Sequence, residues 1–171
     1  MECKNQISIS DVHQMYIEIT RGLMAEGKTV STMESCTSGL IATLLTNIDG
    51  SSAVLQAGKI TYSNAEKIKA GVPAKVIEMH GVYSMQTAIE MAKACQKSSN
   101  ACIGVGVTGT LGWADPNNAD SKPGEVYFAI ACNEINRGFH CFVTGQATRM
   151  DAKYCVAMLV AEQLRKFCLE V

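Results

Sequence analysis

The stretch Thr29-Val30-Ser31-Thr32-Met33-Glu34-Ser35-Cys36-Thr37-Ser38-Gly39 joins two different patterns. Residues 29–33 are predicted to form a short buried strand, and residues 37–47 have the apolar spacing of a helix. A strand that runs into a helix exposes unpaired N–H groups and the positive end of the helix. Hydroxyl groups placed there can cap the helix, hold an anion or act as nucleophiles. Taken alone, the stretch needs no explanation beyond a helix cap.

Strands and helices continue to alternate on both sides of this junction. The apolar spacing predicts helices over residues 9–26, 64–70, 73–79, 84–97 and 147–168. It predicts strands over residues 53–62 and 101–107, and a strand pair over residues 125–132 and 138–144 joined by residues 133–137. We therefore expect an α/β fold, a three-layer α/β/α sandwich with a mixed, mostly parallel central sheet and a late antiparallel strand pair. One domain is expected to cover residues 1–171.

Composition favours a globular protein and excludes several classes of function. The chain has 171 residues, of which 47% are hydrophobic, and this is enough to bury a core. Its net charge of -1 comes without a basic cluster, so we expect no nucleic-acid partner. No apolar run is long enough to span a bilayer, and the first residues lack an apolar signal core. We therefore expect a cytoplasmic protein with no membrane partner.

The eight cysteines are dispersed and show no Cys-x-x-Cys spacing. In a chain of this size without a secretion signal, such cysteines are expected to be reduced thiols used as small core residues. The same spacing argues against a zinc site, and no metal is expected. Cys36 is an alternative nucleophile, because a helix N-terminus stabilises a thiolate. No histidine lies near it in sequence, and His13, His80 and His140 are interpreted as structural or surface residues.

A second strand-to-helix junction lies at Tyr62-Ser63-Asn64-Ala65-Glu66-Lys67. Ser63 and Asn64 are residue types that cap helices. Lys67 is expected in the first turn, where the helix dipole disfavours a cation and makes deprotonation easier. A lysine of lowered pKa would suit the role of general base. The alternative is an ordinary solvated lysine.

Two further segments complete the candidate site. The loop Thr108-Gly109-Thr110-Leu111-Gly112-Trp113-Ala114-Asp115-Pro116 follows a buried strand, where open α/β sheets place ligands, and its glycines allow close approach of the backbone. Arg149 stands at the start of the last helix and has a fork of donors that suits a carboxylate or phosphate. An ordinary connector and a surface arginine are the alternatives. Because these segments follow the ends of different strands, they can meet at one site.

These residues resemble the CinA C-terminal domain family, whose stand-alone members are nicotinamide-nucleotide amidases. The resemblance covers nearly the whole chain, with order and spacing in agreement. Its matching stretches are Glu34-Ser35-Cys36-Thr37-Ser38-Gly39, Gly50-Ser51-Ser52, Tyr62-Ser63-Asn64 with Lys67, Gly71-Val72-Pro73, His80-Gly81-Val82-Tyr83-Ser84, Val107-Thr108-Gly109, Gly124-Glu125-Val126-Tyr127 and Arg149.

The resemblance implies a hydrolase that removes ammonia from nicotinamide mononucleotide and gives nicotinate mononucleotide. It implies Ser35 as nucleophile, Lys67 as its base, and Tyr62 as a residue that assists proton transfer or positions the pair. It also implies no cofactor and a homodimer or higher homo-oligomer. The residues expected to bind the nucleotide are Thr37, Thr108, Gly109 and Arg149.

The sequence departs from the family pattern at two places. Ser38 stands where the family usually has glycine, and its side chain is expected to narrow the space beside the nucleophile. The loop after Thr108-Gly109 usually reads Ile-Ala-Gly-Pro and here reads Thr110-Leu111-Gly112-Trp113. Trp113 could stack on a pyridine ring or cover the loop. Two alternatives to the amidase therefore stay open: a nucleotide-binding or regulatory module without turnover, and an amidase for another small amide.

Overall fold

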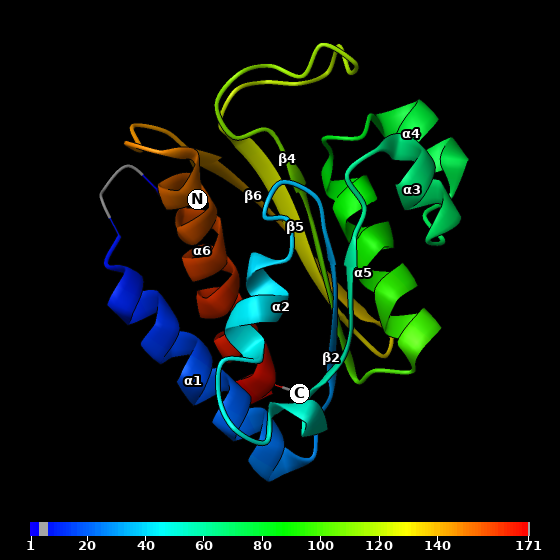
Figure 1. Cartoon of the computed structure of the whole chain (residues 1–171). Coiled ribbons are helices and arrows are strands. Elements are labelled where there is room, and N and C mark those ends of the chain that lie inside the picture. Colours follow the sequence, from blue (N-terminus) through cyan, green and yellow to red (C-terminus); the bar gives the residue numbers. More distant parts are fainter. Residues whose placement is uncertain (4–6, 171) are drawn as a thin grey trace.

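A computed structural model describes residues 1–3 and 7–170, with side chains described as far as residue 168. Six strands form one sheet, and helices cover both of its faces (Figure 1). The strands are β1 (Glu2–Cys3), β2 (Val30–Glu34), β3 (Leu55–Ile60), β4 (Ile103–Gly109), β5 (Glu125–Cys132) and β6 (Ile135–Val143). The helices are α1 (Ile9–Glu26), α2 (Leu40–Leu45), the 3-10 turn η1 (Ser51–Ala53), α3 (Asn64–Lys69), α4 (Ala74–His80), α5 (Met85–Ser99) and α6 (Arg149–Glu170).

The strand order across the sheet is β1-β6-β5-β4-β2-β3. The neighbours of β2 are both parallel to it, and β1 is parallel to β6, whereas β5 runs antiparallel to β4 and β6. This confirms the expected three-layer sandwich with a mostly parallel sheet and a late antiparallel pair. The register pairs Glu34 with both Ile60 and Val107. The carboxyl ends of β2, β3 and β4 therefore lie side by side, and the segments that follow them are brought together.

Helices α1, α2 and α6 cover one face of the sheet, and α3, α4 and α5 lie on the other (Figure 1). The larger core lies under α1 and α6, where branched aliphatic side chains of the sheet meet apolar residues of both helices. On the other face α5 packs directly against the main chain of β4, because β4 carries glycine where the helix crosses. A methyl group at Gly104 or Gly106 would overlap the carbonyl oxygen of Ala92 or Ala88. These glycines therefore set the distance at which α5 packs against the sheet.

Several boundaries differ from the sequence-based predictions for physical reasons. The helix predicted from residue 37 begins at Leu40, because Ser38 and Gly39 adopt left-handed φ values of 53° and 88°. The β5–β6 connection is two residues long rather than five, with Asn133 at φ 52° in a tight turn. Strand β1 was not predicted, since two residues carry no periodic signal. Strand β5 has the predicted bounds.

Six of the eight cysteines are buried, as expected for thiols used as core residues. They are Cys3, Cys36, Cys95, Cys132, Cys141 and Cys155. None of the helices within residues 1–3 and 7–170 has the length and apolar character needed to cross a bilayer.

Candidate active site

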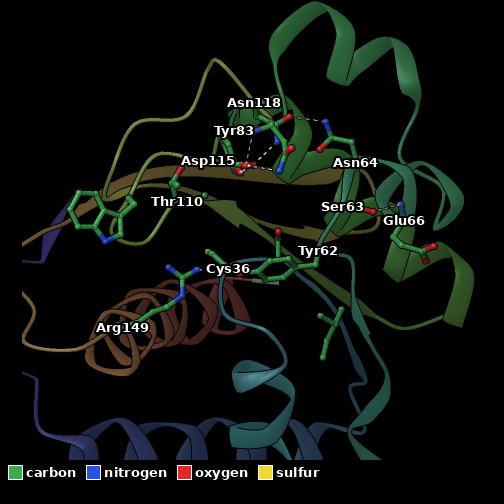
Figure 2. Close-up of a pocket in the computed structure, with 15 residues that line it drawn as sticks. Cys36, Tyr62, Ser63, Asn64, Glu66, Tyr83, Thr110, Asp115, Asn118 and Arg149 are labelled. Carbon is green, nitrogen blue, oxygen red and sulfur yellow. Dashed lines mark hydrogen bonds between the residues drawn. The ribbon is translucent and has the colours of Figure 1, made fainter.

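A cavity of about 640 Å³ opens where the carboxyl ends of β2, β3 and β4 meet. Its wall includes the β2–α2 junction, the segment from the end of β3 to the start of α3, Tyr83, the β4–β5 loop and the first residue of α6 (Figure 2). All three predicted chemical segments and Arg149 therefore meet at one place. Its lining residues include Ser35, Cys36, Tyr62, Gly109 and Arg149.

The Ser35 hydroxyl and the Lys67 amine form the centre of this site. The Lys67 Nζ lies 3.1 Å from the Ser35 Oγ and donates a second hydrogen bond of 2.8 Å to the Thr61 carbonyl oxygen. Lys67 is 1% exposed, and burial lowers its pKa to about 8. The expected position of Lys67 in the first turn was wrong, because α3 is only six residues long and Lys67 lies in its last turn. Burial, and not the helix dipole, makes this amine easier to deprotonate.

A buried carboxylate holds the junction that carries Ser35. The Glu34 side chain is fully buried and accepts hydrogen bonds from the amides of Gly39, Ile41 and Ala42, at 3.0, 3.2 and 2.9 Å. These are among the amides that a helix N-terminus leaves without partners. Sequence reasoning missed this role of Glu34. The available signal was an acidic residue at the end of a predicted buried strand, just before the start of a helix.

Cys36 lines the cavity but is poorly suited to act as a nucleophile. Burial raises the pKa of its thiol to about 12, so the thiolate is scarce at neutral pH. The two main-chain amides directly after Ser35, those of Cys36 and Thr37, have no oxygen acceptor among the described residues.

The predicted nucleotide-binding residues have different surroundings. Gly109 lines the cavity, and a Cβ there would lie 2.7 Å from the Glu125 carbonyl oxygen, so the site requires glycine. Thr108 is fully buried and donates its hydroxyl to the Val82 carbonyl oxygen at 3.0 Å, away from the cavity wall. Thr37 is also buried and outside the wall, although its hydroxyl has no partner among the described residues. Direct ligand contact thus fits Gly109 better than Thr37 or Thr108.

Arg149 links three parts of the cavity wall. Its NH2 group donates to the Tyr62 hydroxyl at 3.2 Å, and its NH1 group donates to the Leu111 carbonyl oxygen. Tyr62 is 62% exposed, and no hydrogen bond in the described chain joins it to Ser35 or Lys67. The structure thus brings Tyr62 to Arg149 and does not bring it to the Ser35–Lys67 pair.

The two departures from the family pattern also have clear positions. The Ser38 hydroxyl donates to the Ser35 carbonyl oxygen at 3.3 Å, and Ser38 does not line the cavity. The expected narrowing beside the nucleophile is therefore absent. Trp113 lines the cavity and is 92% exposed, so its ring is not packed over the loop.

Sequence reasoning missed a hydrogen-bonded group that closes one side of the cavity. The Tyr83 hydroxyl donates to the Asp115 carboxylate at 2.7 Å, and the Asn118 side-chain amide donates to it at 2.6 Å. The Asn64 side-chain amide donates in turn to the Asn118 side-chain oxygen at 2.8 Å. Figure 2 shows this group across the cavity from Tyr62 and Arg149. It joins the β4–β5 loop, whose sequence departs from the family pattern, to the start of α3, the helix that carries Lys67 in its last turn.

The fold and site define an α/β domain with a buried Ser–Lys pair, and comparison with known proteins identifies its family. Residues 12–168 match the model of the CinA C-terminal domain, so the chain belongs to the CinA C-terminal domain family. It is 40% identical over 121 residues to a nicotinamide-nucleotide amidohydrolase PncC of Enterobacter agglomerans, covering 70% of this chain and 73% of that one.

Another relative has a name that states only its likeness to CinA. A CinA-like protein of Koribacter versatilis is 39% identical over 129 residues, which cover 74% of this chain and 29% of the relative. The chain thus spans about a third or less of several curated relatives that it matches. The crystal structure of competence/damage inducible protein CihA from Agrobacterium tumefaciens has a TM-score of 0.83 at 31% identity, covering 91% of this chain and 94% of that one.

Proposed function

We propose that this chain hydrolyses the carboxamide of nicotinamide mononucleotide, releasing ammonia and nicotinate mononucleotide. The observation that carries the proposal is the 3.1 Å contact between the Ser35 Oγ and the buried Lys67 Nζ. A serine hydroxyl is a weak nucleophile until a base takes its proton. The neutral form of Lys67, favoured by burial, would be that base. The similarity to a protein named as a nicotinamide-nucleotide amidohydrolase supports the choice of substrate.

The reaction would proceed in two halves. Lys67 takes the proton of Ser35, and the Ser35 Oγ attacks the carboxamide carbon. The oxyanion that forms accepts hydrogen bonds from the amides of Cys36 and Thr37. Lys67 returns the proton to the amide nitrogen as the C–N bond breaks, and ammonia leaves. Water then attacks the Ser35 ester with Lys67 again as base, and nicotinate mononucleotide is released with Ser35 restored.

In this proposal Arg149 binds the phosphate or another anionic part of the nucleotide. Its NH1 and NH2 groups already donate to Leu111 and Tyr62, so the guanidinium is held in place before the ligand arrives. Tyr62 is then a residue that positions Arg149. A preoriented guanidinium gives up little conformational freedom when it binds an anion.

Ammonia release from nicotinamide mononucleotide tests the proposal. We expect turnover by the wild-type chain and a loss of at least about 1000-fold in kcat for Ser35→Ala. The kcat of Lys67→Met is expected to fall by a similar factor. Saturable nucleotide binding without ammonia release would indicate a binding module instead, and release by Lys67→Met at the wild-type rate would exclude Lys67 as the base.

A further inference from the structure

Asp115 places a fixed negative charge on the cavity wall. Its Oδ1 accepts from the Asn117 amide and side chain at 2.9 and 3.3 Å, and its Oδ2 accepts from Tyr83 and Asn118 at 2.7 and 2.6 Å. The Tyr83 hydrogen bond is the largest cause that lowers the Asp115 pKa to about 2. All four donors are neutral, and Asp115 forms no ion pair within the described chain. Asp115 therefore has no ion-pair partner in the described chain, and its charge reaches the Lys67 amine only from beyond ion-pair distance, where it opposes the lowering of the pKa of that group.

The position of this carboxylate is fixed from several sides. The Asn118 that donates to it accepts in turn from Asn64, and the Asp115 amide donates to the Ser121 hydroxyl at 2.8 Å. Figure 2 shows Asp115 held between Tyr83 and Asn118, facing the space above Tyr62 and Arg149. A charge held this way acts without reorganisation when a ligand arrives.

Two other groups on the wall lack one kind of interaction, a hydrogen bond for the Thr110 hydroxyl and an ion pair for Arg149. Thr110 is 7% exposed, and its hydroxyl has no hydrogen-bond partner within residues 1–3 and 7–170. Arg149 donates to neutral oxygens and forms no ion pair with a described carboxylate. Glu66 also lines the cavity, but it is exposed and lies 3.6 Å from the Lys69 Nζ. The cavity wall thus carries one anion, Asp115, and one cation, Arg149, that form no ion pair with a described residue.

We propose that Asp115 determines specificity by selecting substrates that carry a cationic ring, with Arg149 at the anionic end. This inference rests on the proposed function and deepens it. A pyridinium ring bonded through its nitrogen to ribose is cationic and has no N–H to donate. Such a ring is stabilised by a nearby negative charge and needs no hydrogen-bond acceptor. Asp115 fits this role, because its oxygens already receive four hydrogen bonds from neutral donors and it forms no ion pair in the described chain.

The test compares two ligands that differ in ring charge. Nicotinamide mononucleotide and its 1,4-dihydro form share the ribose, phosphate and carboxamide, but the reduced ring is neutral. Calorimetric dissociation constants are measured in the Ser35→Ala chain, which prevents turnover. We expect the oxidised form to bind about tenfold more tightly. Adding Asp115→Asn is expected to weaken the oxidised form about tenfold and the reduced form less than twofold.

Asp120→Asn is the matched control. It removes the same charge from the same loop, but Asp120 is not part of the cavity wall and accepts instead from the Tyr83 amide at 3.1 Å. It is expected to change both dissociation constants less than about twofold. Tyr83→Phe removes a donor but keeps the Asp115 charge, so it should preserve the ratio of the two constants.

The outcomes separate this inference from the proposed function. Equal weakening of both nucleotides by Asp115→Asn would show that Asp115 only shapes the loop, and would overturn the inference alone. Failure of the Ser35→Ala chain to bind either nucleotide would overturn the proposed function as well. Should Asp115→Asn not fold, the salt dependence decides. We expect the preference for the oxidised form to fall as sodium chloride is raised, and an unchanged preference would contradict the inference.

Discussion

The Nζ of Lys67 lies 3.1 Å from the Oγ of Ser35, and both residues are almost completely withdrawn from solvent. An amine in that position is costly to charge, because it has lost its hydration and faces only the Thr61 carbonyl oxygen and a hydroxyl. Under the proposed mechanism, the same contact has consequences for both catalysis and folding, and each can be measured separately.

The first prediction concerns the pH dependence of the reaction. Burial lowers the Lys67 pKa to about 8, and the base must be neutral to act. We expect kcat/KM to rise with pH and to level off above about pH 8, with activity at pH 7 near a tenth of the plateau. Initial rates of ammonia release between pH 6 and 10 measure this profile. A profile that is flat over this range would exclude Lys67 as the titrating base.

The second prediction concerns stability. The folded protein holds the Lys67 proton more weakly than the unfolded chain, so this group destabilises the fold fully below pH 8, and the cost declines as the pH rises toward the unfolded pKa. Lys67→Met is therefore expected to raise the free energy of unfolding at pH 7, on the order of 2 kcal/mol. Urea denaturation should show the gain shrinking above pH 8. A less stable Lys67→Met chain would contradict this account.

The third prediction separates Ser35 from Cys36. Because burial raises the Cys36 pKa to about 12, Cys36→Ala is expected to keep kcat within about threefold of wild type. Iodoacetamide should modify Cys102 first, since that thiol is exposed and its pKa is lowered by a hydrogen bond with Thr29. Peptide mass spectrometry alongside the ammonia assay tests both points. Inactivation that follows alkylation of Cys36 would favour the thiol instead.

The fourth prediction concerns Glu34. Glu34→Ala leaves three buried or half-buried amides without their acceptor, so we expect a loss of about 3 kcal/mol or more in the free energy of unfolding. Activity should fall as well, because Ser35 is the next residue. Glu66→Gln is the control, since this exposed carboxylate should change stability by less than about 0.5 kcal/mol. Similar losses in both variants, measured in urea, would argue against a special role for Glu34.

The fifth prediction decides the role of Tyr62. Its hydroxyl accepts from Arg149, so Tyr62→Phe should raise KM several-fold and leave kcat within about threefold of wild type. A direct role in proton transfer would instead lower kcat by about 100-fold or more at an unchanged KM. Steady-state kinetics with nicotinamide mononucleotide distinguish the two outcomes.

Local patterns in the sequence predicted the order of strands and helices after β1, because the longer elements have their own apolar spacing. The bounds of β5 agree residue for residue, since Glu125 to Cys132 follow a loop and end in a tight turn. The predicted start of α2 was wrong, because the left-handed residues Ser38 and Gly39 lie inside a segment whose apolar spacing still looks helical.

The candidate site was predictable only where short segments carry chemistry of their own. The segments that contain Ser35 and Lys67 were found in this way, but the roles predicted for these two residues came from the family resemblance. The cause of the low Lys67 pKa was not predicted, because burial is a tertiary property. The contacts of Asp115 with Tyr83 and of Asn64 with Asn118 join residues 32 and 54 positions apart. No local spacing reports such contacts, and this loop departs from the family pattern.

The close packing of α5 against β4 has a consequence for mutational tolerance. Any side chain at Gly104 or Gly106 would push the helix away from the sheet. Tyr83 lies two residues before α5, and its hydroxyl holds Asp115 over the cavity. A saturation library at these two positions should therefore return almost only glycine, as strictly as one at Ser35. Two residues that no ligand can reach would be among the least replaceable in the chain.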